Sequence, residues 1–224
     1  MQGIMEKKKT NNGEKAMKNW TRTMAALAVA MIAAGTAWGD VGIGVMAGYW
    51  NIDDFPAEDI DGLGGATLRV EAELLPILGI EARLGVYGMD DEWSKRVDDK
   101  WVDYDFWTDV VSVEAGLVGN LPLGPLTLYG GGGVGAYFID GKMKVWEGPW
   151  RRHDVDLEYD TEVGAYAFGG LEISLAPNIA IVGEVRYTWL DTTVDAEWNG
   201  YKLMDGENVC LDGFGAEIGL MFWL

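Results

Sequence analysis

The sequence has little of what most catalytic and metal sites are made of. Its 224 residues include one cysteine, Cys210, and one histidine, His153. A single cysteine excludes an internal disulfide framework, so we interpret Cys210 as an incidental rim or loop residue, with an intermolecular bridge as the alternative. Nucleophilic catalysis needs a base beside the nucleophile. We predict no enzyme, because no serine lies within a few residues of His153; the serines are Ser94, Ser112 and Ser174.

Basic residues and long apolar runs are also scarce. The chain has 17 Lys and Arg against 36 Asp and Glu, a formal net charge of −19. That balance repels nucleic acid and excludes it as a partner. Beyond residue 39, no run of about eighteen apolar residues occurs, so the sequence predicts no transmembrane helix.

The first 39 residues differ from the rest and are predicted to be a secretory signal. Lys18 and Arg22 precede an apolar run from Met24 to Ala34, and the small residues Ala37 and Gly39 follow. Such a run is too short to span a membrane and has the polarity of a signal peptide. We expect translation to begin at Met17, which would make residues 1–16 an upstream mis-start. Residues 40–224 then form a single domain.

The stretch from Ala66 to Tyr87 alternates between two kinds of side chain around a short uncharged turn. Period-two alternation places successive side chains on opposite faces of a strand. A soluble sheet would bury its apolar face under a second layer, but no segment of the chain is left to form one, so the apolar face is predicted to meet lipid. The apolar face holds Leu68, Val70, Ala72, Leu74, Ile80, Ala82, Leu84 and Val86, and the charged face holds Arg69, Glu71, Glu73, Glu81 and Arg83.

Eight stretches of residues 40–224 alternate in this way, and each is long enough to cross the apolar band of an outer membrane. The connections between them alternate between two kinds along the chain. The long, polar ones are 52–61, 89–106, 140–160 and 191–210, and the others are short and contain proline. An even number of strands lets the first and last pair and removes the sheet edges. We therefore predict an all-β fold, an eight-stranded antiparallel up-and-down transmembrane β-barrel. The strands are Val41 to Asn51, Gly62 to Leu75, Leu78 to Gly88, Trp107 to Leu121, Leu126 to Ile139, Glu162 to Leu175, Ile179 to Leu190 and Leu211 to Leu224.

The same alternation sorts the aromatic residues and glycines. Aromatic residues recur where the strands meet the long connections and predict an interfacial girdle, at Tyr49, Trp107, Phe138, Trp189 and Phe214. The inward positions interleave glycines with large rings, which lets a narrow barrel fill its own interior. These positions include Gly131, Gly133, Gly135, Trp50, Tyr87, Tyr129, Tyr137, Tyr166 and Phe168.

The inward charges are the most specific feature of the sequence, because they are all Glu or Arg. Arg suits a confined ion-pair network, since its planar fork can hold two carboxylates. If the turn after the second strand centres on Ile77, Glu71 lies opposite Arg83 and Glu73 faces Glu81. Three Arg cannot neutralise seven Glu, so we predict either carboxyls of raised pKa or bound water and cations; the alternative is a salt-bridge network that merely plugs the barrel. The predicted network is Arg69, Glu71, Glu73, Glu81, Arg83, Glu114, Glu172, Glu184, Arg186 and Glu217.

These features resemble the small eight-stranded outer-membrane proteins of the OmpA, OmpX and OmpW kind over residues 40–224. In these families the terminal residue is usually Phe, recognised during assembly with the alternate apolar positions before it. Here Leu224 ends the chain, while Phe222, Leu220 and Ile218 keep the alternation. The resemblance implies the outer membrane of a Gram-negative-type bacterium and contact with outer-membrane lipid.

Two functions are expected. The first is a non-enzymatic structural or surface-interaction role, with a plugged lumen and long aromatic and acidic loops that contact an extracellular partner. The alternative, implied by the OmpW-like resemblance, is a narrow channel or transporter for small apolar molecules or ions. No cofactor is expected, apart from calcium or magnesium at the acidic loops, because hard cations favour clustered carboxylates. Those clusters are Asp53, Asp54, Glu58, Asp59 and Asp61, and Asp98, Asp99, Asp103 and Asp105.

Overall fold

The computed structural model describes residues 40–52, 62–97, 100–147, 151–159, 161–198 and 201–224. Within these ranges every regular element is a β-strand. No helix in this part of the chain is long and apolar enough to cross a membrane. Eight strands form the barrel: β1 (Val41–Ile52), β2 (Leu63–Leu75), β3 (Leu78–Val97), β4 (Lys100–Leu123), β5 (Leu126–Glu147), β7 (Glu162–Ala176), β8 (Ile179–Trp189) and β11 (Gly213–Trp223).

The eight strands close into a ring of antiparallel pairs. Around the ring the order is β1, β2, β3, β4, β5, β7, β8 and β11, and β11 pairs with β1. Each predicted strand overlaps one of these, and the ends agree within two residues except where β3, β4 and β5 continue further at the end opposite the short turns. The predicted eight-stranded up-and-down barrel is therefore confirmed.

The three short turns also form as predicted. They lie at residues 76–77, 124–125 and 177–178, between β2 and β3, β4 and β5, and β7 and β8. Each contains a proline, which cannot donate a ladder hydrogen bond and so favours a turn. Gly124 has φ of +77°, a conformation that residues with a Cβ rarely adopt. These turns fix one end of the barrel, called here the short-turn end.

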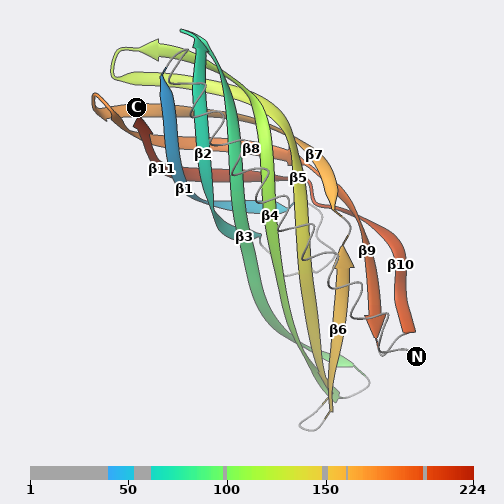
Figure 1. Cartoon of the computed structure of the whole chain (residues 1–224). Helices are drawn as coiled ribbons and strands as arrows, with labels where there is room; N and C mark the ends of the chain where they lie inside the picture. The colour runs from blue at the N-terminus through green and yellow to red at the C-terminus, as the bar shows by residue number, and fades with distance from the viewer. Residues whose placement is uncertain (1–39, 53–61, 98–99, 148–150, 160, 199–200) are drawn as a thin grey trace.

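The long connections were predicted as loops, and for three of them that prediction is wrong. β3, β4 and β5 continue past the barrel, and three further strands join them: β6 (Arg151–Tyr159), β9 (Asp191–Trp198) and β10 (Tyr201–Cys210). The resulting extension is a sheet in the order β3, β4, β5, β6, β9 and β10, which projects from one side of the barrel (Figure 1). The many charges of these segments suggested loops, but residues such as Val102, Tyr104 and Phe106 keep the period of a strand. The remaining long connection, 52–61, lies almost entirely outside the described residues.

The side chains on the outer wall are mostly apolar and exposed, as the alternation predicts. Leu68 and Ile218 are exposed, with 41% and 65% of their surface accessible. At the end opposite the short turns, Tyr187 packs edge-on against Trp189 and Phe214 at 4.9 and 4.7 Å between ring centres, in the place expected for the girdle. Some residues that alternation places outward are instead buried. They include Val41, Val70 and Ala72, which form a small cluster with Ile80, and also Ala82 and Val113.

The glycines of β5 allow close approach between strands, which can be tested with a pair of alanine substitutions. A Cβ at Gly133 would collide with the Ala115 carbonyl oxygen and the Gly116 Cα, and this backbone cannot move aside cheaply. A Cβ at Gly183 would meet nothing within 4 Å. We expect Gly133→Ala to lower the free energy of unfolding by about 1–3 kcal/mol, the cost of overpacking. The matched Gly183→Ala should stay within about 0.5 kcal/mol of the wild type. Urea unfolding in lipid vesicles measures both, and equal losses would contradict this account.

Candidate functional site

Buried side chains inside the barrel lie in successive layers. Near the long-connection end lies an apolar layer, called here the upper cap: Trp50, Ile52, Leu63, Tyr87, Val110, Tyr137, Leu190 and Leu211. Towards the short-turn end, Met46, Ala180, Val182 and Met221 form a second apolar cluster. Between the two lie eight buried charged residues, called here the buried ion network: Arg69, Glu71, Glu81, Arg83, Glu114, Glu184, Arg186 and Glu217.

Arg83 is the centre of the network. Its Nε and Nη2 donate to the two oxygens of Glu81, both at 2.9 Å, so the contact is bidentate. Its Nη1 and Nη2 also donate to Glu184, with Nη2 at 2.9 Å from Oε2. Charge-assisted, bidentate pairs are the strongest of the hydrogen bonds that proteins make. One guanidinium thus binds two carboxylates from different parts of the wall.

Arg69 shares the same carboxylates. Its Nη2 donates to Glu71 at 2.7 Å, its Nε lies 3.0 Å from Glu81, and its Nη1 lies 3.4 Å from Glu184. The guanidinium also lies 4.7 Å above the centre of the Tyr129 ring, and Arg83 lies 4.3 Å above that of Phe168. Aromatic faces attract cations. The rings of the lumen therefore support the same charges that the carboxylates pair.

The predicted register of the β2–β3 hairpin is wrong. Glu71 lies opposite Glu81 rather than Arg83, Arg69 lies opposite Arg83, and Glu73 lies opposite Gly79. The turn consists of Pro76 and Ile77, and a bulge between Glu73 and Leu75 shifts the pairing. Like charges therefore face each other across the hairpin. They are accommodated because Arg69 reaches along its own strand to Glu71 and diagonally to Glu81, while Arg83 reaches along its own strand to Glu81.

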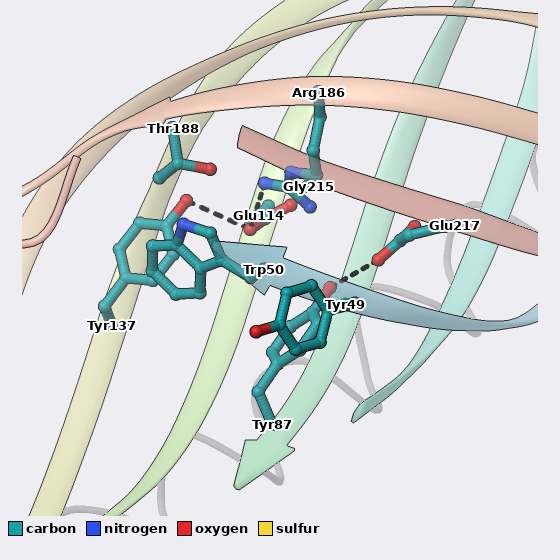
Figure 2. A pocket seen from close by; sticks show the side chains of 9 residues that line it. All are labelled: Tyr49, Trp50, Tyr87, Glu114, Tyr137, Arg186, Thr188, Gly215 and Glu217. Atoms are coloured by element: carbon teal, nitrogen blue, oxygen red, sulfur yellow. Dashed lines mark hydrogen bonds and ion pairs between the residues drawn. The ribbon is translucent and has the colours of Figure 1, made fainter. Parts of the chain in front are cut away.

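A second pair lies closer to the upper cap. Arg186 Nη2 donates to Glu114 Oε1 at 2.8 Å, and its guanidinium lies 4.9 Å above the Tyr166 ring (Figure 2 shows the pair). Tyr137 donates its hydroxyl to the same Glu114 oxygen at 3.0 Å.

Neutral donors complete the network, and sequence reasoning missed them. Tyr166 donates to Glu81 at 3.0 Å, Asn120 to Glu71 at 2.8 Å, and Thr67 to Glu217 at 2.8 Å. Tyr87 also donates to Glu217. Alternation places these side chains inside the barrel, but it does not say which carboxylate each one reaches.

Glu73 and Glu172 are partly exposed and lie towards the short-turn end, outside the buried ion network. Glu172 accepts a hydrogen bond from Trp223 Nε1 at 3.0 Å. The eight residues that remain comprise five carboxylates and three guanidiniums. The prediction of carboxyls of raised pKa, or of water or cations in the lumen, thus concerns an excess of two acidic groups at full ionisation. It stays a prediction.

The residues weighed for catalysis lie in different parts of the fold. Ser112 is buried in the barrel wall opposite Tyr137, whereas the backbone of His153 pairs with Val145 in the extension. The acidic clusters weighed for calcium or magnesium lie mainly outside the described residues. Within the described part of the chain, no three His, Cys, Asp or Glu side chains are grouped so that they could hold a metal ion.

A closed antiparallel barrel with an apolar outer wall and buried charges inside defines a small membrane-spanning β-barrel protein. The family model described as the outer membrane protein beta-barrel domain matches residues 23–222. The chain belongs to this family, and its place is the outer membrane of a Gram-negative-type bacterium. No curated protein matches the sequence.

Solved structures share the fold at low sequence identity. The outer membrane protein OprG from Pseudomonas aeruginosa aligns with a TM-score of 0.57 at 13% identity, over 84% of this chain and 96% of that chain. A major outer membrane protein from Thermus thermophilus aligns with a TM-score of 0.54 at 16% identity, over 83% of this chain and 98% of that chain. At such identities the likeness concerns the fold and not the activity.

Proposed function

We propose that this protein is a non-enzymatic outer-membrane barrel whose lumen is closed to solutes and whose extension makes contacts at the cell surface. The buried ion network is the observation on which the closed lumen rests. Its charges lie across the lumen and are bonded to one another, so a passing ion would have to displace paired groups that are shielded from water.

The upper cap supports the same proposal. It places eight buried apolar or aromatic residues above the charges, including Trp50, which packs against Tyr87 and Tyr137 at 6.0 and 6.2 Å between ring centres. Apolar constrictions oppose the entry of water and ions.

The extension supports the surface role. In outer-membrane barrels the short turns face the periplasm and the long connections face the outside. The extension therefore lies at the cell surface, where a sheet of six strands offers a more ordered contact face than separate loops would. Where it meets the barrel, Lys144 pairs with Asp105 at 3.1 Å and lies 4.8 Å above the Trp107 ring.

Single-channel recording in planar bilayers tests the closed lumen. We expect no conductance steps above the bare bilayer from the purified protein at neutral pH, with a general porin as the positive control. Liposomes that carry the protein should likewise not swell in small sugars. Regular conductance steps would overturn the proposal.

The alternative is a narrow channel or transporter for small apolar molecules or ions. It requires a continuous path from the extension to the short-turn end through both the upper cap and the buried ion network. The bilayer recording decides this for ions, and uptake of a small apolar dye into proteoliposomes decides it for apolar solutes.

A further inference from the structure

The short-turn end of the barrel has an apolar surface. Figure 1 shows the three short turns gathered at that end. Residues 75–78, 121–126 and 175–179 include no charged residue. Turns in water usually carry polar side chains. The exposed large side chains of these segments are called here the turn surface: Leu75, Ile77, Leu78, Leu121, Leu123 and Leu175.

The turn surface continues the lipid-facing wall. At the outward positions of β7, the exposed residues Leu171 and Ile173 are followed by Leu175, with no polar side chain between them on that face. Ile77 in the β2–β3 turn is as exposed as Ile218 in the middle of the wall, 64% against 65%. The outer face therefore shows no change of polarity at which lipid would end and water begin.

The length of the strands places the turns at the boundary of the apolar band. In β8, Trp189 of the girdle lies about ten residues from Ile179, which follows the β7–β8 turn. Trp189 pairs with Ala165 of β7, which in turn lies about ten residues before Leu175. Ten residues at about 3.3 Å each, tilted near 40°, rise roughly 25 Å, the height of the apolar band of an outer-membrane barrel. The strands therefore end where the band ends.

The tryptophan at this boundary does not face outward. Outer-membrane barrels carry aromatic girdles at both interfaces, where the polar tip of Trp or Tyr reaches water. Trp223, near the end of β11, instead donates to Glu172 and packs against the cluster of Met46 and Met221 inside the barrel. Its neighbour Phe222 is exposed but has no polar atom. The outward side chains at this level thus suit acyl chains better than water.

The turn backbones are also prepared for an environment with little water. Unpaired backbone groups are costly in lipid. Each turn contains a proline, which has no N–H to leave unpaired. Each turn also has a carbonyl oxygen that accepts a hydrogen bond from the next strand around the ring: Ile77 from Asn120 at 3.0 Å, Pro125 from Ser174 at 2.9 Å, and Asn178 from Trp223 at 3.0 Å.

We propose that the turn surface is immersed in the periplasmic leaflet of the outer membrane, so that the barrel ends within the lipid and does not protrude into the periplasm. Phospholipid is the partner that these observations favour over a periplasmic protein, because the turn surface is continuous with a wall that already contacts lipid. Immersion removes from water apolar side chains that the fold itself leaves exposed. The inference goes beyond the proposed function, because it applies equally to a closed and to a conducting barrel.

Collision measurements on the spin-labelled protein test the immersion. Ile77→Cys and Leu123→Cys, each in a Cys210→Ser background, carry a nitroxide label in phosphatidylcholine vesicles. Ile218→Cys is the lipid reference, and Asp90→Cys, exposed at the opposite end of the barrel, is the water reference. Oxygen concentrates in lipid and a nickel chelate in water, so the ratio of their collision rates reports the surroundings of the label.

We expect the oxygen-to-nickel ratio at both turn sites to be several-fold higher than at Asp90. The vesicles contain no other protein, so a high ratio assigns the contact to lipid. Ratios equal to that at Asp90 would place the turns in water and overturn the proposal. The change in gel migration on heating, which folded barrels show, confirms that each variant is folded.

A measurement on the unaltered protein in lipid nanodiscs gives an independent answer. We expect the Ile77 δ-methyl group to show magnetisation-transfer cross-peaks to acyl-chain protons, as the Ile218 methyl group does. Ile77→Val removes the δ-methyl group and assigns the signal. A cross-peak from Ile77 to water without one to the acyl chains counts against immersion.

Discussion

The Arg83→Met variant is expected to lose about 3–5 kcal/mol of unfolding free energy, the cost of removing one partner from a buried ion pair. Arg83 donates hydrogen bonds to both oxygens of Glu81, and two of its nitrogens donate to Glu184. Methionine keeps an unbranched apolar stem and has no charge, so the change leaves the carboxylates in the lumen with less compensation. Urea unfolding in lipid vesicles, followed by tryptophan fluorescence, gives the value.

Two further variants isolate the cause. Lys144→Met breaks a partly exposed pair with Asp105 and should cost no more than about 1 kcal/mol. The double variant Arg83→Met/Glu184→Met should be less destabilised than the sum of the two single variants, because a buried pair replaced as a unit leaves fewer uncompensated charges. Strict additivity would mean that the Arg83–Glu184 contact stabilises little.

The Ile218→Arg variant is expected to lose about 2–4 kcal/mol, the cost of arginine on a lipid-facing site near the bilayer midplane. Ile218 lies at the middle of β11, opposite Ala47, and 65% of its surface is exposed. The apolar outer wall is what places this residue in lipid. Unfolding in vesicles of one lipid composition provides the measurement.

Depth in the membrane distinguishes this effect from a general intolerance of charge. Val163 also points outward and is 76% exposed, but it lies at the start of β7, at the long-connection end. Val163→Arg should therefore cost only about 0–1 kcal/mol, as at the interface. Equal costs for the two variants would show that Ile218 does not face the lipid core.

The sequence predicted most of the barrel because a membrane-spanning strand must show both environments in its alternation. Leu68 and Arg69 are adjacent in the chain, and alternation along the strand is enough to assign Leu68 to lipid and Arg69 to the lumen. The structure places them so. The extension was missed because outside the membrane nothing requires one face to be apolar. The segment from Val102 to Phe106 does alternate aromatic and β-branched residues with aspartates, but the many charges around it favoured a loop.

The inner site was less predictable than the wall. Parity puts Glu71, Glu81 and Arg83 inside, but their partners depend on a one-residue bulge before Pro76 that no local signal marks. Tyr87 and Tyr137 were expected to fill space, whereas they also donate to Glu217 and Glu114. Such contacts form across the lumen between distant strands, and periodicity carries no information about the opposite wall.

The Arg83–Glu184 contact joins strands that stand diametrically opposed, because β3 and β8 are four places apart in either direction around the ring. It therefore acts as a strut across the cylinder's diameter, which resists flattening and fixes the shape of the cross-section. The Arg83–Glu184 contact can form only once β8 has reached its place opposite β3. β8 follows β3 by about a hundred residues in the chain. We therefore expect the cylinder to gain its rigidity late in assembly, in a single step that coincides with closure.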